Sequence, residues 1–297
     1  MRALLGYFAI AVAPLVLAGR PIHAGAPELW AIHQANLQDA AANQGNELKA
    51  PEGASCELTK IIPRTSKRLQ EFVDNVNRIS ATEVLIHERL NKDGKPREHD
   101  RRKFTYVAIM QEDTPGMLSL DEYRNGVAGN SVFPGDIATM GMPALVMVFH
   151  PYHRDEFEMT CESLSTWRNR PVWLVHFRQR KDKPDHMSAI RVGNKSYPVL
   201  LMGTAWIDAE TYQIIHLETD LLEPIPEVRL YSEHQVLDYG PVRFEVRDIS
   251  LWLPKEADII LDSCGKRFHH RHTFSNYQIF SVDYGEKIGE PKQDLTP

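Results

Sequence analysis

The sequence lacks the short motifs that mark the common catalytic and nucleotide-binding folds. It contains no Walker pattern, no G-x-G-x-x-G turn, no EF-hand loop and no G-x-S-x-G nucleophile elbow. Predicted strands do not alternate with helices, which argues against Rossmann and α/β-barrel enzymes. Residue types alone do not exclude a Ser-His-Asp or Cys-His site assembled from distant residues. We predict no catalytic residue and no cofactor, and we expect the protein not to be an enzyme.

The chain also lacks an excess of basic residues. Its 34 Lys and Arg are outnumbered by 40 Asp and Glu, which gives a formal net charge of −6. The first 24 residues carry Arg2 and Arg20 and no acidic residue, so removing them changes the charge from −6 to −8. An acidic protein repels phosphate backbones, and nucleic acid is therefore disfavoured as a partner.

Cysteine is scarce, and Cys56, Cys161 and Cys264 lie far apart with no C-x-x-C pair. Without such paired ligands, a zinc site built from them is disfavoured. In an exported protein three cysteines predict at most one disulfide and one free thiol. Cys56 and Cys161 are the favoured pair.

The N-terminus has the layout of a secretory signal peptide. A basic residue precedes an apolar run from Leu4 to Ala18, and small residues follow. The run of about 15 residues is shorter than the roughly 20 that a membrane-spanning helix needs. We predict a signal peptide in residues 1–24, cleaved near Ala24 or at Ala18, with an uncleaved membrane anchor as the alternative. The mature protein is expected in the periplasm or secreted, with no stable membrane span.

Two segments have the pattern of helices. In residues 67–79 apolar side chains recur at steps of three and four, which predicts an amphipathic helix capped by Thr65 or Ser66. The segment from Ile137 to His150 is apolar nearly all round. We interpret it as a buried helix ended by Pro151; a buried strand over residues 144–149 is the competing interpretation.

Most of the remaining chain predicts short antiparallel strands, because β-branched and aromatic residues alternate with polar ones between closely spaced turns. One hairpin spans residues 202–221, with a polar turn at Asp208 and Glu210. Val242 and Phe244 alternate with charged residues, so one face of the sheet is expected to be buried and the other solvated. The predicted strands are 82–90, 103–111, 117–123, 156–161, 172–179, 187–192, 202–207, 213–221, 227–238, 242–253, 257–262, 266–274 and 277–282.

The densest group of titratable residues is His269, His270, Arg271 and His272. On a strand His270 and His272 share a face, a spacing that can chelate Zn²⁺ or Cu²⁺. A working site needs a third ligand, such as His216, His234 or a carboxylate, and neighbouring arginines repel a metal. A solvated strand face without metal is the favoured interpretation, and we predict no metal-ligating residue.

The order of these elements resembles the LolA/LolB/RseB-like group of periplasmic proteins. The similarity covers residues 80–283. It includes the helix, the Gly203–Asp208 hairpin strand, Trp252-Leu253-Pro254-Lys255 and Phe274-Ser275-Asn276-Tyr277. The sequence also resembles uncharacterised exported proteins of acidobacterial type, through Trp167-Arg168 and Tyr239-Gly240-Pro241-Val242. The resemblance implies a curved antiparallel sheet, an incomplete barrel whose apolar concave face is covered by helices and binds lipid tails or partner proteins.

These observations predict a mainly β (α+β) fold of about ten strands covered by two or three helices. The expected organisation is a signal peptide (1–24), a flexible N-terminal segment (25–60), a β domain (61–285) and a C-terminal tail (286–297). The expected function is that of an exported binding protein for an apolar ligand, such as a lipid acyl chain or lipidated protein, or for a partner polypeptide. The alternatives are a structural, interaction or sensor module of the cell envelope without ligand, and a metal-binding enzyme that uses the 269–272 histidines.

Overall fold

The structure, a computed structural model, describes residues 56–76, 78–114, 117–128, 133, 139–183, 187, 189–192 and 195–280. The predicted signal peptide, residues 25–55 of the predicted N-terminal segment and the predicted C-terminal tail lie outside the described residues. No helix in the described part combines the length and the apolar character needed to cross a membrane.

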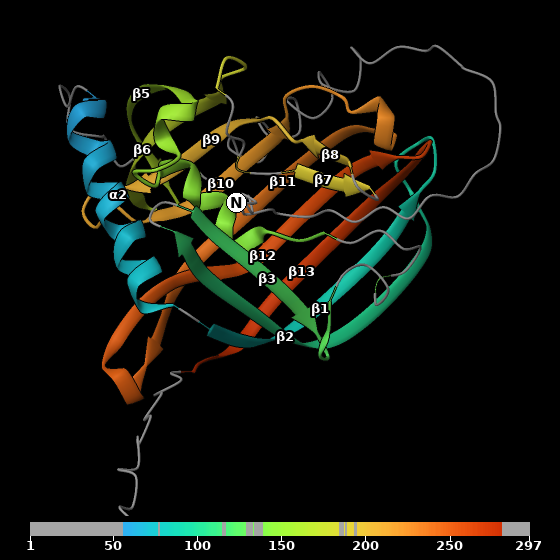
Figure 1. The fold of residues 1–297 in the computed structure, drawn as a ribbon, viewed down its shortest axis with the longest axis horizontal. Helices are drawn as coiled ribbons and strands as arrows, with labels where there is room; N and C mark the ends of the chain where they lie inside the picture. The colour runs from blue at the N-terminus through green and yellow to red at the C-terminus, as the bar shows by residue number, and fades with distance from the viewer. Residues whose placement is uncertain are drawn as a thin grey trace, which may run out of the picture.

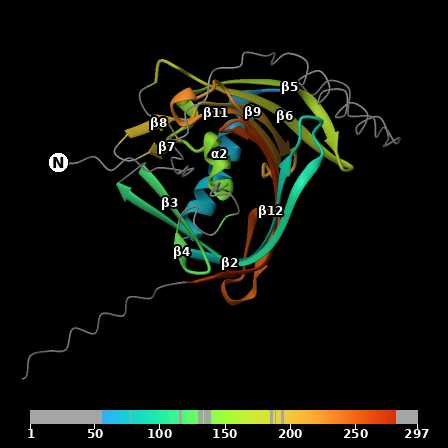
Figure 2. The ribbon, with the colours of Figure 1, turned by 90° about the vertical axis from the view of Figure 1, so that its right-hand side faces the viewer.

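Eleven strands form one antiparallel sheet in the order β4-β3-β2-β1-β13-β12-β11-β10-β9-β6-β5. The sheet is open, with β4 and β5 at opposite ends of this order, and it curves around a concave face (Figures 1 and 2). This confirms the predicted fold class. The strands are β1 (Arg78–Leu90), β2 (Pro96–Thr114), β3 (Met117–Arg124), β4 (Val127–Ala128), β5 (Phe157–Trp167), β6 (Arg170–Gln179), β9 (Leu201–Asp208), β10 (Ile214–Leu221), β11 (Leu230–Phe244), β12 (Ile249–Ser263) and β13 (Lys266–Ile279).

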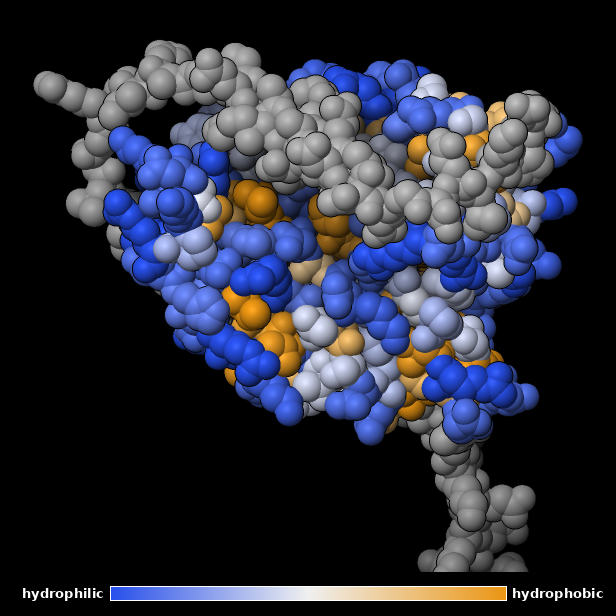
Figure 3. All heavy atoms as spheres, turned by 180° about the vertical axis from the view of Figure 1, so that it is seen from behind, coloured by the Kyte–Doolittle hydropathy of each residue, from blue (hydrophilic) through white to orange (hydrophobic). Residues whose placement is uncertain are grey.

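The concave face carries the core. Along β12, Leu251, Leu253, Ile259 and Leu261 are buried, because alternate residues of a strand point to the same side. The opposite, outer face is largely hydrophilic, with hydrophobic residues in separate patches (Figure 3). Helix α2 (Leu58–Asn75) and the 3₁₀ helix η3 (Met142–Phe149) lie within the curve of the sheet. The smaller elements are the hairpin β7 (Ala189–Val192) and β8 (Lys195–Pro198), and the 3₁₀ turns η4 (Arg154–Glu156), η5 (Pro226–Val228) and η6 (Glu245–Arg247).

The two predicted helices exist but differ from the prediction. Helix α2 begins at Leu58 and ends at Asn75, so Thr65 and Ser66 are buried inside it rather than capping it. Pro63 also lies inside the helix, although proline usually favours a helix start. The segment ending at His150 is helical and buried as predicted, which contradicts the strand alternative, but it is a 3₁₀ helix and not an α-helix.

Predicted strand boundaries are wrong in at least three places. Residues 242–253 are not one strand, because Asp248 adopts φ +54° and η6 reverses the chain between β11 and β12. Conversely, β12 continues through Pro254, where a register shift between Asp238 and Tyr239 of β11 marks a bulge that accommodates the proline. Strand β13 likewise continues through residues 275–276 past a register shift opposite Ser80 and Thr82.

The predicted cysteine pairing is confirmed. Cys56 and Cys161 form a disulfide with Cα atoms 5.9 Å apart, and Cys264 is free. The bond joins the chain just before α2 to β5, across a sequence separation of 105 residues. It therefore fixes the start of α2 to the edge of the sheet.

Candidate functional site

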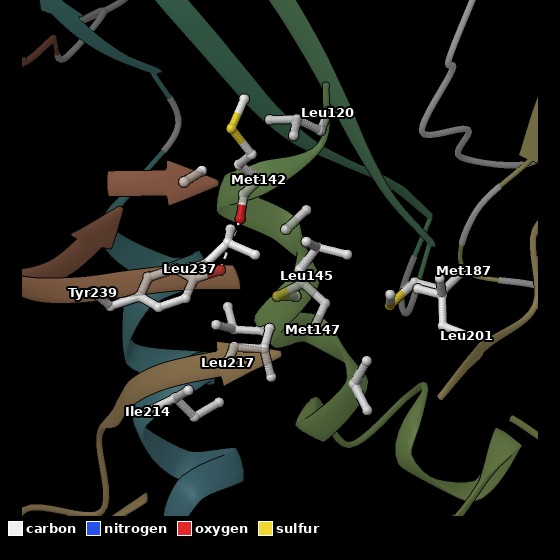
Figure 4. Packing of buried hydrophobic residues seen from close by; sticks show 14 of the residues in the cluster. Leu120, Met142, Leu145, Met147, Met187, Leu201, Ile214, Leu217, Leu237 and Tyr239 are labelled. Carbon is white, nitrogen blue, oxygen red and sulfur yellow. Dashed lines mark hydrogen bonds between the residues drawn. The ribbon is translucent and has the colours of Figure 1, made fainter. Parts of the chain in front are cut away.

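Helix η3 covers the apolar part of the concave face. All eight of its residues, MPALVMVF, are buried. 3₁₀ helices longer than four residues are uncommon because their hydrogen bonds are poorly aligned, so packing must supply much of the stability of this segment. Figure 4 shows side chains of η3 facing residues of β10 and β11; those labelled are Met142, Leu145 and Met147 from η3, and Ile214, Leu217, Leu237 and Tyr239 from the sheet.

Three hydrogen bonds join η3 and the glycine before it to the rest of the fold. The Ser66 hydroxyl donates to the Phe149 carbonyl oxygen at 2.6 Å, and the Tyr239 hydroxyl donates to the Met142 carbonyl oxygen at 2.8 Å (Figure 4). The Gly141 N–H donates to Glu122 Oε2 at 2.5 Å. These bonds place one polar anchor at the end of η3 and two at its start.

A small cleft lies beside η3, between α2 and strands β10 to β12. It is lined in part by Phe72, Val146, Tyr239 and Trp252, and its volume is about 40 Å³. Pockets for drug-sized ligands usually measure about 300–1,000 Å³. A long acyl chain does not fit into this cleft while η3 is in place.

The half of the concave face formed by β1, β2, β3 and β13 holds a buried ionisable network. At its centre Arg124 donates from Nε and Nη2 to the two carboxylate oxygens of Glu83, at 2.6 and 2.9 Å. Both side chains are at most 1% exposed. Burial would raise the pKa of Glu83, but the Arg124 guanidinium and the His272 side chain outweigh it, so the pKa is lowered. The pair is therefore ionised.

A chain of hydrogen bonds extends from this pair. His272 Nδ1 lies 2.7 Å from Glu83 Oε1, and Thr139 Oγ1 lies 2.7 Å from His272 Nε2 and 3.1 Å from His270 Nδ1. His270 Nε2 lies 2.8 Å from His87 Nδ1. Burial first, then the neighbouring His272 and His87, hold the pKa of His270 well below its usual value. One assignment of donors and acceptors along the chain, running from His87 Nδ1 as the first donor to Glu83 Oε1 as the last acceptor, satisfies every bond.

The same network reaches η3 through Glu122. The Tyr106 hydroxyl donates to Glu122 Oε1 at 2.5 Å, while Glu122 Oε2 accepts from Gly141. Burial raises the pKa of Glu122 despite Arg124 and these two donors. We use the name ionisable network for Glu83, His87, Tyr106, Glu122, Arg124, Thr139, His270 and His272.

A second group of buried polar side chains lies on the same face but is not fully paired. Each of four residues has a buried atom without a hydrogen-bond partner in the described part of the chain. These atoms are Gln179 Nε2, Thr219 Oγ1, Gln235 Oε1 and Ser263 Oγ. Buried Glu233 belongs to the same group, since its Oε1 accepts from Gln235 Nε2 at 2.6 Å. These five residues form what we call the polar strip.

The histidines predicted from sequence divide between the two faces of β13. His270 and His272 share a face as predicted, but that face is buried rather than solvated. His269 lies on the other face, with Nε2 2.6 Å from Asp258 Oδ1. The possible third ligand His216 pairs instead with Asp238. Within the described residues, no group of three or more His, Cys, Asp or Glu side chains is placed to hold a metal ion.

Sequence reasoning identified His270 and His272 but missed the other members of the ionisable network and the whole polar strip. The sequence does contain a signal for these polar residues, which is their spacing from core residues on the same strand. Glu83 lies two residues from buried Leu85, and Gln235 lies two residues from buried Leu237. A polar residue that lies an even number of positions from core residues of the same strand must itself face the core. Asking which polar residues share this spacing would have identified Glu83, Glu233 and Gln235.

No family model matches the chain, and the sequence matches none of the curated proteins. The solved structures that are similar to it include two at 10% sequence identity each. One is a DUF1329 family protein from Desulfovibrio piger, with a TM-score of 0.43, covering 78% of this chain and 95% of that one. The other is an outer membrane lipoprotein-sorting protein domain from Vibrio parahaemolyticus, with a TM-score of 0.39, covering 78% and 96%.

Proposed function

We propose that the protein is an exported, non-catalytic binding protein that holds an apolar chain against the concave face of its sheet, in the place occupied by η3. One observation carries this proposal: a wholly apolar segment of eight residues covers the inner side of an open, curved sheet. The surface beneath η3 is built of interchangeable apolar side chains. Such a surface accepts a hydrocarbon chain as readily as it accepts Met, Leu and Val.

In this proposal the ligand must replace η3, so the free energy gained by binding has to be compared with the free energy lost by displacing η3. A C16 chain that buries roughly 400 Å² gains about 10 kcal/mol before ordering costs, at about 25 cal/mol per Å². Displacing η3 loses a comparable apolar contact and its three anchoring hydrogen bonds. Binding is therefore favourable when the displaced segment finds another apolar contact or when the ligand fills the face more completely. In this proposal η3 is a movable lid.

The compartment is also part of the proposal. A signal peptide predicted from sequence and the Cys56–Cys161 disulfide both suit an oxidising, extracytoplasmic environment. The ligand would then be a lipid acyl chain, or the acyl chain of a lipidated protein, of the cell envelope.

Native mass spectrometry with organic extraction tests this function on protein purified from a periplasm. A copurifying lipid or acylated peptide is the expected result. An empty protein that also ignores added C16 lipids would refute ligand binding.

A variant that weakens the packing of η3 against the sheet tests whether η3 is a movable lid. Met147→Ala removes a side chain that is 2% exposed and should destabilise the fold by about 2–5 kcal/mol. If the ligand replaces η3, the closed form loses this energy and the apparent affinity for a C16 lipid rises by at least about tenfold. The matched control is Val172→Ala, which truncates a fully buried residue that does not belong to the hydrophobic core cluster around η3 and should leave the affinity unchanged. Weaker binding by Met147→Ala would show that η3 contacts the ligand instead of leaving its place.

An interaction module is the second candidate, because η3 fills the concave face and the cleft beside it is small. In that case the sheet serves as a scaffold that binds a partner polypeptide at its surface. Capture of a protein partner by lipid-free protein, together with no effect of Met147→Ala on lipid binding, would favour this candidate.

A further inference from the structure

We propose that Thr219, Glu233 and Gln235 form a recognition site for the polar end of the bound molecule, and that this end is an uncharged group carrying a hydroxyl or amide hydrogen. The inference rests on the proposed function and narrows it. It identifies the ligand as a neutral amphiphile, whose apolar chain replaces η3 and whose head contacts the centre of the polar strip.

The three side chains lie together on the concave face. Thr219 of β10 is directly opposite Gln235 of β11 in the antiparallel register. Directly opposite residues in such a pair have Cβ atoms about 4.5–5.5 Å apart. Glu233 lies two residues from Gln235, on the same face, and accepts its hydrogen bond. The sheet register therefore assembles one compact polar group from two neighbouring strands.

This group borders the apolar surface under η3. Leu217 and Leu237 are opposite each other in the same register, two residues away from Thr219 and Gln235. Figure 4 shows both leucines beneath η3. A ligand with its chain over the leucines thus has its head beside Thr219 and Gln235.

Part of the hydrogen-bonding capacity of the group is unused within the described residues. Thr219 is 1% exposed and Gln235 is 6% exposed, and neither Thr219 Oγ1 nor Gln235 Oε1 has a partner in the described part of the chain. Leaving a buried polar atom unpaired is costly, so native proteins normally provide it with a partner. An amide oxygen can only accept, so Gln235 requires a ligand hydroxyl or N–H. The Thr219 hydroxyl can donate to the ligand or accept from it.

The charge of the group selects against anions. Burial raises the pKa of Glu233 to about 7, and the opposing contribution is the hydrogen bond from Gln235. Among the described residues no ion pair includes Glu233, and no basic side chain contributes to its pKa shift. The described residues therefore offer no cation beside Glu233 for a ligand carboxylate or phosphate. A neutral head with hydroxyl groups, such as that of a monoacylglycerol, has the required chemistry.

Three C16 probes test the inference on delipidated protein by displacement of a neutral fluorescent dye: monopalmitoylglycerol, methyl palmitate and palmitate. Monopalmitoylglycerol should bind about 10- to 100-fold more tightly than methyl palmitate, which has no donor, and more tightly than the palmitate anion. Equal affinities for monopalmitoylglycerol and methyl palmitate would mean that ordered water alone satisfies the group, and would overturn the inference. So would tighter binding of palmitate.

The decisive variant is Thr219→Val, which keeps the shape of the side chain and removes the hydroxyl. It should lose part of the preference for monopalmitoylglycerol, because Gln235 Oε1 can still accept from the ligand, and it should retain the wild-type affinity for methyl palmitate and unfold at a higher temperature. Thr273→Val, on the exposed outer face of β13, is the matched control and should change neither affinity. If Thr219→Val keeps the preference, the head-group site is wrong although the lipid-binding function stands; if wild type binds no probe at all, both fail.

Discussion

The concave face carries two sets of buried polar side chains that differ in how completely they are paired. In the ionisable network, Glu83 and Arg124 form a bidentate pair, and the imidazoles and Thr139 satisfy one another. In the polar strip, Thr219 and Gln235 have atoms without a partner in the described part of the chain. Both sets are equally buried, so exposure to solvent does not explain the difference.

This difference in hydrogen bonding indicates that the two sets of buried polar side chains have different roles. A fully paired network specifies one arrangement of the strands and, through Glu122, fixes the residue preceding η3. An incompletely paired group lowers stability and specifies little. Proteins retain such a cost mainly at functional sites. The two sets therefore predict opposite responses to the removal of a polar group.

The largest effect is expected from Arg124→Met. It leaves the Glu83 carboxylate buried and unpaired, and should lower the free energy of unfolding by about 3–5 kcal/mol. Chemical denaturation measures this change. Adding Glu83→Gln to the variant should restore part of the loss, because it removes the charge. Arg89→Met, which breaks the exposed pair with Glu98, is the control and should cost at most about 1 kcal/mol. A loss this small for Arg124→Met would show that the network does not hold the fold together.

The second-largest effect is expected from Glu233→Gln, which should raise the free energy of unfolding relative to wild type by an amount that depends on pH. Because the folded protein raises the pKa of Glu233 from 4.5 to about 7, it binds a proton that the unfolded chain has released between these values. This contribution to stability is fully present below pH 4.5 and is lost as the pH rises to about 7. Glu233→Gln has no such loss, so its stability relative to wild type should rise by about 3 kcal/mol between pH 4 and pH 8.

Denaturation at several pH values measures the difference for Glu233→Gln, and the exposed outer-face variant Glu256→Gln supplies the baseline. A difference between Glu233→Gln and wild type that does not vary with pH would indicate that Glu233 contacts solvent or a cation.

The fold was largely predictable because strands depend on local pattern. The alternation in β1, β6, β9, β10 and β13 locates these strands from sequence, and antiparallel pairing follows from the short connections. The errors arose where tertiary structure overrides local signals. Pro254 suggested a strand end, but a bulge in β12 accommodates it. The apolar periodicity predicted a helix start near residue 67, but α2 begins at Leu58, beside the Cys56–Cys161 disulfide.

The candidate site was predictable only in part. The apolar pattern that identifies η3 as a covering segment is visible in the sequence. The partners of Glu83 are not, since Arg124 is 41 and His272 is 189 residues away, and only the sheet register brings them together. That Thr219 Oγ1 and Gln235 Oε1 have no partner in the described residues is even harder to predict, because sequence patterns indicate which residues face inward but not which of them meet.

The smallest effect is expected from two buried serines: Ser66, whose hydroxyl is hydrogen-bonded, and Ser263 of the polar strip, whose hydroxyl has no partner in the described residues. Ser66→Ala removes the donor to the Phe149 carbonyl and should cost about 1–2 kcal/mol, less a few tenths because alanine favours the helix. Ser263→Ala removes a fully buried hydroxyl with no partner in the described residues, and should be neutral or stabilise by up to about 1 kcal/mol. Thermal and chemical denaturation of both variants give the sign directly. Both changes delete a hydroxyl group from a buried serine. Equal losses of stability would therefore mean that the Ser263 hydroxyl has a hydrogen-bond partner in solution, and that the polar strip is more completely paired than the structure indicates.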